Sequence, residues 1–182
     1  NRQLSYLIIF VTARCNLLCE HCFYTEEIQN AKSEKELSLE EYKKIALEII
    51  NNANYSVLTT VENNQVDSRT MDHFKVESDF ILYFGTNVNS RKVKQIQKNP
   101  NVTVHFNSKE NDGYVSIKGY AYVNNDSVVI NKYWKDDWNI FYRDKSNYRV
   151  IKVIIKSFEL ISERYNILGD SLTWKSPKVI LN

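Results

Sequence analysis

Two groups of residues in this sequence have the side chains and spacings to bind a metal or an anion. The first is a cysteine cluster. Cys15, Cys19 and Cys22 are the three cysteines of the chain and follow the pattern C-x3-C-x2-C. An apolar run, residues 6–11, comes just before them and predicts a strand. Three thiolates this close can hold three irons of a [4Fe–4S] cluster and leave the fourth iron open. The motif therefore predicts a metal site with Cys15, Cys19 and Cys22 as its ligands.

The second group is basic and lies in residues 86–100, which read TNVNSRKVKQIQKNP. Ser90 is a suitable N-cap for a helix over residues 91–98. Arg91 and Lys92 then fall in the first turn, where the helix dipole disfavours positive charge. A bound anion would offset this, because the free amides of a helix start and basic side chains both bind anions.

Nearby side chains extend this predicted anion site. Thr86 and Ser90 add hydroxyl donors, and Arg69, on an expected strand, adds a third cation. The simpler alternative is an ordinary solvated helix that happens to begin with two basic residues. Taken alone, the helix start does not decide between the two, and its neighbours along the chain favour the anion.

The elements that would position these residues are helices and short strands. Ser38 and Glu41 form a capping-box pattern, and apolar residues behind it recur at helical spacing. From Tyr55 onward, β-branched and aromatic runs alternate with turn signals such as Asn63-Asn64. We expect strands over residues 56–61, 66–71, 80–84, 102–106, 114–123 and 150–155, and a helix over residues 127–138.

The chain changes character near residue 38, which predicts two parts. Residues 1–37 would be a strand–loop–helix appendage that carries the cysteines, with little to bury. Residues 38–182 would be a mainly β (α+β) domain with few helices, in which short strands close into an antiparallel barrel.

Composition excludes some classes of function. The formal net charge is only +2, with both signs interspersed, which gives no reason to expect nucleic acid or a membrane surface as a partner. The sequence has no apolar run near the roughly 20 residues of a membrane helix. An odd, clustered set of cysteines without a signal peptide indicates a reducing, cytoplasmic location.

Five motifs follow one another in the second part of the chain. They are Ser68–Met71, Leu82–Asn87, Ser90–Lys92, Asn99–Pro100 and Gly113–Gly119. This order closely resembles that of the pyridoxamine 5′-phosphate oxidase-like FMN-binding split barrels, in particular the general stress protein 26 branch. The resemblance spans roughly residues 46–161. It implies a split β-barrel, a homodimer, and FMN bound in grooves between the two subunits.

The resemblance also implies which residues bind the flavin. They would be Arg69, Thr70, Met71, Gly85, Thr86, Ser90, Arg91, Lys92 and Tyr114. Arg69, Arg91 and Lys92 would hold the FMN phosphate. Thr70 and Met71 would line the isoalloxazine edge with their backbone groups, and Gly85-Thr86 would lie beside the ribityl chain.

Two departures from the family pattern affect the expected reaction. Tyr114 stands where the oxidases carry a glutamine contact from the second subunit, and we find no match to the C-terminal arginine that those enzymes use for the substrate phosphate. These departures argue against pyridoxamine phosphate oxidation. We expect instead electron transfer through flavin from a reduced nicotinamide to a small acceptor, and the alternative is a non-enzymatic flavin- or haem-binding stress module.

Three aromatic side chains near the expected flavin allow two interpretations each. We interpret His73 as a polar surface residue rather than a substrate contact. Trp134 and Trp138 would share one helix face, and we expect them to pack in the core rather than to stack on flavin.

The cysteine loop resembles the opening of radical S-adenosylmethionine enzymes. In that family the open iron of the cluster chelates S-adenosylmethionine, but this chain lacks the rest of the barrel that binds it. Three interpretations remain: a cluster that passes electrons to flavin, a cluster completed by another chain, or a fusion remnant with ordinary thiols.

Overall fold

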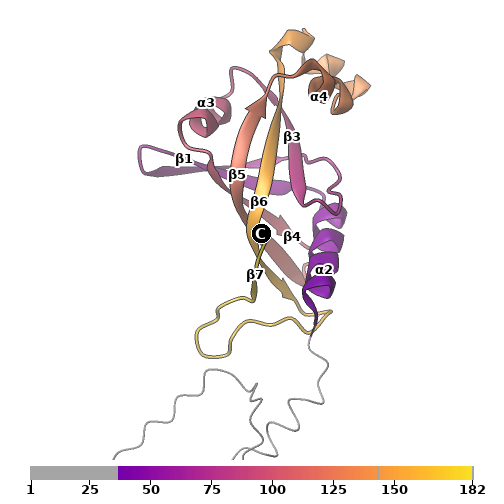
Figure 1. The fold of residues 1–182 in the computed structure, drawn as a ribbon, viewed down its shortest axis with the longest axis vertical. Coiled ribbons are helices and arrows are strands. Elements are labelled where there is room, and N and C mark those ends of the chain that lie inside the picture. The colour runs from indigo at the N-terminus through magenta and orange to yellow at the C-terminus, as the bar shows by residue number, and fades with distance from the viewer. Residues whose placement is uncertain (1–36, 143, 182) are drawn as a thin grey trace, which may run out of the picture. The chain divides into compact units, whose positions relative to one another are not determined.

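The computed structural model describes residues 37–142 and 144–181. The chain from Leu39 onward forms one compact unit, built on an antiparallel sheet of seven strands (Figure 1). The strands are β1 Ser56–Glu62, β2 Gln65–Met71, β3 Ile81–Asn87, β4 Asn101–Asn107, β5 Gly113–Asn124, β6 Tyr148–Ser162 and β7 Lys178–Ile180. The mainly β fold class predicted for this part of the chain is confirmed.

The helices of the described residues are short. They are α2 Leu39–Asn52, α3 Arg91–Lys98 and α4 Ser127–Lys132, with 3-10 turns at Asp136–Ile140 and Lys145–Asn147. Among them, no helix has both the length and the apolar character that crossing a membrane requires.

The β1–β2 hairpin is joined by the predicted Asn63-Asn64 turn. Both asparagines have positive φ, 51° and 60°, which the two-residue turns that match strand twist require. The pairing runs without a shift from Ser56 opposite Met71 to Glu62 opposite Gln65. This hairpin therefore fixes which residues of β2 lie opposite which residues of β1.

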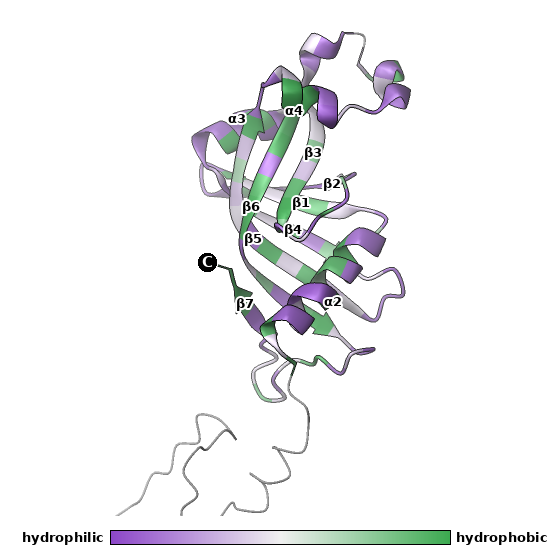
Figure 2. Ribbon diagram, turned by 45° about the vertical axis from the view of Figure 1, so that its right-hand side comes forward, coloured by the Kyte–Doolittle hydropathy of each residue, from purple (hydrophilic) through white to green (hydrophobic). Residues whose placement is uncertain are grey.

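The order of the strands is β2-β1-β4-β5-β6-β3, with β7 paired to β6. This order leaves β2 and β3 at the two edges, and the Phe74 amide just after β2 donates to the Tyr83 carbonyl of β3 at 3.1 Å. Hydrophobic and hydrophilic residues alternate along the strands (Figure 2), so that one face lines the core. The largest fully buried side chains there include Leu58, Leu82, Phe84, Phe106, Ile117 and Tyr148.

Helix α2 covers part of the core with one apolar face. Ile45, Ala46, Ile49 and Ile50 are buried, and the helix packs against β4 and β5. At its C-terminal end the Asn51 side chain donates to the Val76 carbonyl at 2.9 Å and accepts from the Val76 amide at 2.8 Å. The amphipathic helix predicted behind Ser38 is confirmed.

The predicted helix over residues 127–138 is wrong. Helix α4 ends at Lys132, and the chain turns again only at Asp136–Ile140. The helix breaks because aromatic side chains pack elsewhere: Tyr133 stacks on Tyr83 at 4.2 Å between ring centroids. Trp134 and Trp138 do not share one helix.

Trp134 and Trp138 nevertheless pack together, as half-buried members of an aromatic cluster. Each meets the buried ring of Tyr148 edge-on, at centroid distances of 5.2 and 5.5 Å. Both therefore pack against a core residue, as expected, although neither Trp is itself buried. Strand β6, which carries Tyr148, is much longer than the predicted run of residues 150–155, and β7 was not predicted.

The predicted cluster ligands Cys15, Cys19 and Cys22 lie outside the described residues, so the iron–sulfur site stays a prediction. Within the residues that the structure describes, no group of three or more His, Cys, Asp and Glu side chains is arranged to hold a metal ion.

His73 is not the solvated surface residue that the sequence suggested. Its Nε2 lies 2.9 Å from the Ile50 carbonyl, and its ring meets Phe106 edge-on at 5.0 Å. Because a carbonyl only accepts, Nε2 carries the proton and Nδ1 is the bare nitrogen. That Nδ1 is buried and has no hydrogen-bond partner among the described residues.

We expect His73 to make the fold sensitive to mild acid. Burial lowers its pKa below the ordinary 6.5, and Lys135 lowers it further, while the Ile50 carbonyl and Asp72 oppose these effects. The unfolded chain then binds the proton first, so stability is fully present above pH 6.5 and is lost as the pH falls below it. The free energy of unfolding, measured in urea between pH 7.5 and 5, should decline in this window.

The variant His73→Gln keeps a donor for the Ile50 carbonyl and removes the titration. Its stability should change less than that of the wild-type protein between pH 6.5 and 5. An equal decline in both proteins would show that other groups cause the loss.

Candidate functional site

The predicted anion site is built first from the inward face of β2. Side chains alternate along a strand, so Asp67 and Arg69 share the face that turns toward the barrel. The hairpin register sets Thr60 opposite Asp67 and Leu58 opposite Arg69. A carboxylate, a guanidinium and a buried hydroxyl are thereby brought together by local structure alone.

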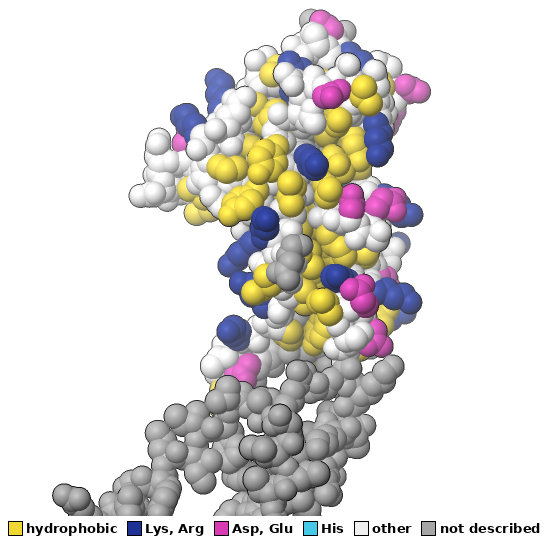
Figure 3. Space-filling view, in the orientation of Figure 1, with side chains coloured by type: hydrophobic (Ala, Val, Ile, Leu, Met, Phe, Trp, Pro, Cys, Tyr) yellow, Lys and Arg dark blue, Asp and Glu magenta, His cyan; other side chains and the backbone are white. Residues whose placement is uncertain are grey.

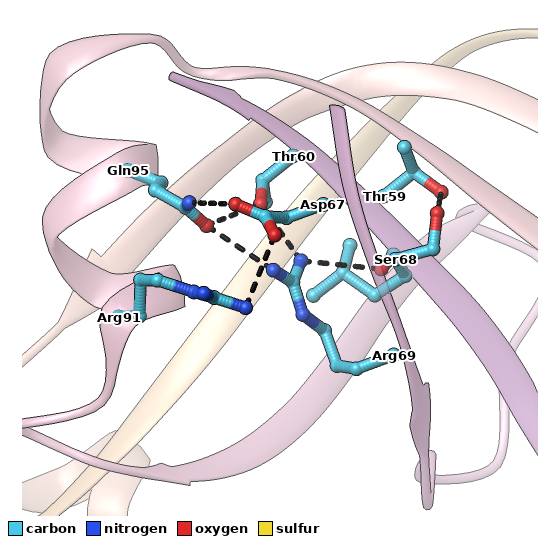
Figure 4. A network of polar contacts seen from close by, with 8 residues as sticks. Thr59, Thr60, Asp67, Ser68, Arg69, Arg91 and Gln95 are labelled. Atoms are coloured by element: carbon cyan, nitrogen blue, oxygen red, sulfur yellow. Dashed lines mark hydrogen bonds and ion pairs between the residues drawn. The ribbon is translucent and has the colours of Figure 1, made fainter. Parts of the chain in front are cut away.

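Arg69 is held in place by the neighbouring strand and by helix α3. Its Nη1 donates to the Leu58 carbonyl at 3.2 Å and to the Thr60 hydroxyl at 2.7 Å. Its Nη2 donates to Oε1 of Gln95 at 3.1 Å, across the gap to α3 (Figure 4). These three contacts fix the orientation of the guanidinium.

Gln95 joins the two sides of this network. Its side chain is fully buried, and its Oε1 accepts from the Thr60 hydroxyl at 2.6 Å as well as from Arg69. Its Nε2 donates to Oδ2 of Asp67 at 2.6 Å. The amide therefore presents its oxygen to the cation and its nitrogen to the carboxylate, which is how a buried amide satisfies both ends.

The other half of the site lies where β3 leads into α3. Thr86 is 3% exposed, and its hydroxyl lies 3.0 Å from the hydroxyl of Ser90. Nζ of Lys92 donates to the Thr86 hydroxyl at 3.1 Å. Ser90 does occupy the N-cap position, but its side chain makes no capping bond to the helix, because it bonds to Thr86 instead.

The positive charges of Arg69, Arg91 and Lys92 lie within electrostatic reach of one another. Burial lowers the pKa of Lys92, and the charge of Arg69 lowers it further. Burial also lowers the pKa of Arg69, and Arg91 adds to this, while Asp67 opposes it. The positive charges of Lys92 and Arg69 are therefore only partly stabilised by water and by neighbouring groups.

The carboxylate that contacts these cations is Asp67, which pairs with Nη2 of Arg91 at 3.0 Å. Helix α3 itself has no acidic residue in its first turn. Three cations and one carboxylate leave two positive charges to be matched. An anion with several oxygens and two negative charges, such as a phosphate monoester, fits this arrangement.

Three other residues of the predicted flavin site are on the same strands: Thr70 and Met71 follow Arg69 on β2, and Gly85 precedes Thr86 on β3. Thr70 is exposed on the outward face of β2, whereas Met71 is 8% exposed on the inward face. Since β2 is an edge strand, backbone groups on its outer side are not used in the sheet. On β3, a Cβ added to Gly85 would lie 2.2 Å from the Trp138 ring, so glycine is needed there to admit that ring.

Tyr114, in contrast, lies far from the cations within one chain. It pairs with Ile161 of β6, whereas Thr86 pairs with Arg149 at the other end of the same strand. Those partners are twelve residues apart, which at about 3.3 Å per residue is roughly 40 Å. The Tyr114 hydroxyl bonds instead to the Ser176 hydroxyl at 2.6 Å.

Sequence reasoning thus found the cations and the hydroxyls but missed Thr60, Asp67 and Gln95. A signal for Asp67 exists, because it stands two residues before Arg69 on the same strand face. Gln95 is three residues after Lys92 and shares its helix face. Their mutual contacts depend on how α3 packs against β1 and β2, which spacing alone does not show.

Comparison with known proteins supports the fold and places the chain in a family. The chain is similar to the general stress protein 26 from Bacillus anthracis, with 27% identity and a TM-score of 0.61 over 77% of this chain and 98% of that one. It is also similar in fold to a pyridoxamine 5′-phosphate oxidase-related, FMN-binding protein from Nostoc punctiforme, with 16% identity and a TM-score of 0.59 over 81% and 98%. The predicted split β-barrel is therefore confirmed.

A curated protein shows a shorter but closer match. Pyridoxine/pyridoxamine 5′-phosphate oxidase 2 from Hydrogenovibrio crunogenus is 44% identical over 69 residues, which are 37% of this chain. The match spans about a third of that relative's length, 32%. Residues 40–160 match the family model described as pyridoxamine 5′-phosphate oxidase like, and because these residues make up more than half of the sequence, the chain belongs to that family.

Proposed function

We propose that this protein binds FMN through the cations of the candidate site and acts as a flavin-dependent oxidoreductase. The observation that carries the proposal is that Arg69 lies within electrostatic reach of both Arg91 and Lys92, with too little negative charge to match the three cations. A relative of the same fold is named as FMN binding, and the matched curated relative is named as a pyridoxine/pyridoxamine 5′-phosphate oxidase.

The residues of the site have distinct roles in this proposal. Arg69, Arg91 and Lys92 bind the terminal phosphate, and the hydroxyl of Ser90 donates to one of its oxygens. Backbone groups of β2 at Thr70 and Met71 and the backbone at Gly85-Thr86 hold the rest of the molecule. FMN supplies the capacity to take a hydride from a reduced nicotinamide and pass electrons to a small acceptor.

A second copy of the chain completes the site in this proposal. If Tyr114 contacts flavin, a partner subunit must supply it, because roughly 40 Å of β6 separates it from Thr86 in one chain. The outer face of the barrel has a mainly apolar groove of about 300 Å³ that includes Val61, Val66 and Tyr120. Figure 3 shows hydrophobic side chains exposed among Lys and Arg side chains on one face.

The first prediction from the proposed function concerns the phosphate. Replacing Lys92 by Gln removes a half-buried cation that we place on the phosphate, and affinity for FMN should fall by roughly tenfold or more. Affinity for riboflavin, which has no phosphate, should stay unchanged. Quenching of flavin fluorescence on titration measures both.

The matched control is Lys94→Gln, because Lys94 is on the same helix and exposed. Wild-type and control proteins should bind FMN equally. A wild-type protein that shows no affinity for FMN would refute the proposed function.

The second prediction concerns turnover. The FMN-loaded protein should oxidise NADH or NADPH steadily in the presence of a small electron acceptor, as followed by the loss of absorbance of the nicotinamide. Bound FMN without any turnover would instead favour the non-enzymatic flavin-binding alternative.

The third prediction concerns assembly. In solution the protein should have twice the 21.5 kDa mass of the chain, as measured by light scattering after size-exclusion chromatography. Val66→Glu places a charge in the apolar groove and should shift the protein toward monomer. Val128→Glu, at an exposed position of α4, is the control and should leave the dimer intact.

A further inference from the structure

Asp67 differs from every other member of the candidate site, because it carries the wrong charge for binding an anion. Its side chain is 26% exposed and fixed by the bond from Nε2 of the buried Gln95 to Oδ2 at 2.6 Å. Its other oxygen, Oδ1, pairs with Nη2 of Arg91 at 3.0 Å. The bond from Gln95 thus fixes the carboxylate, and its other oxygen is directed to Arg91.

Arg91 differs from the other two cations in how it is held. Arg69 makes three hydrogen bonds to β1 and α3, and Lys92 bonds to the nearly buried Thr86. The side chain of Arg91 is 69% exposed, and its ion pair with Asp67 is of the surface kind that costs little to break. Of this ion pair, Asp67 is the fixed partner and Arg91 the movable one.

We propose that Asp67 determines how tightly the site holds a phosphate group. Its carboxylate engages Arg91 when no phosphate is bound, and it repels a phosphate that enters between Arg69 and Lys92. Binding therefore requires Arg91 to leave Asp67 and turn to the ligand. This inference rests on the proposed function, because it takes the phosphate of FMN as the ligand.

The charges of the site give the consequence of this arrangement. With Asp67 in place, the three cations present two net positive charges, enough for one phosphate dianion but with no surplus. Without the carboxylate, all three cations would act on the ligand. Asp67 thus weakens the site, so that FMN exchanges with the solution rather than staying permanently bound.

The test is to neutralise the carboxylate while keeping an acceptor for Gln95. Asp67→Asn does this, and Asp67→Ser, which removes the charge with a shorter hydroxyl side chain, guards against the first variant failing to fold. Each should bind FMN roughly tenfold more tightly than the wild-type protein at low salt. The gain should shrink as salt is added, and riboflavin affinity should not change.

A matched control is available on helix α2, outside the candidate site. Lys43 pairs with Glu40 at 2.8 Å, so Glu40→Gln also removes one negative charge and one exposed ion pair. We expect this variant to bind FMN as the wild-type protein does. A gain equal to that of Asp67→Asn would overturn the proposal, because it would show a general effect of net charge.

The role of Arg91 is tested by combining substitutions. In an Arg91→Gln background, Asp67→Asn should tighten FMN binding much less than in the wild-type background. An equal gain in both would overturn the exchange of partners by Arg91. If the wild-type protein binds FMN and both Asp67 variants fold but bind no more tightly, the inference fails while the proposed function stands.

Discussion

The candidate site depends on holding Arg69, Arg91 and Lys92 close together despite the repulsion between their positive charges. Arg69 and Lys92 are partly buried, so water does not fully screen them. Thr60 and the amide of Gln95 supply acceptors for Arg69, and Thr86 supplies one for Lys92. The polar contacts between β1, β2 and α3 therefore serve to hold like charges together, which a site for a doubly charged anion needs.

The aromatic cluster stabilises the other side of the same site. Gly85 leaves room for the Trp138 ring, and Tyr148, at the start of β6, packs against Trp138. Gly85 directly precedes Thr86 on β3, and Tyr148 pairs with Asn87, which directly follows it; the Thr86 hydroxyl accepts from Lys92. Trp138, whose ring the sequence left as a candidate for contact with flavin, thus supports the strand that positions the Thr86 hydroxyl.

Sequence patterns predicted most elements because their signals are local. The bounds of α3 agree with the structure, since Ser90 starts the helix and Asn99-Pro100 stops it. The helix over residues 127–138 was wrong because Tyr133 leaves the helix to stack on Tyr83, which is distant in sequence. Asp67 and Gln95 were not identified from the sequence for the same reason. Their importance lies in the hydrogen bond between them, which forms only in the folded chain.

The position of β3 in the sheet has a consequence for the order of folding. In the sheet β3 pairs with β6 alone, although some sixty residues separate them along the chain. The hairpin half of the site, with Asp67 and Arg69, can form from neighbouring residues, but Thr86 reaches its place only after β6 has been synthesised and paired. Pairings of such long range are slow to form because loop closure costs entropy. A ligand held between the two halves would favour the completed barrel over an open intermediate.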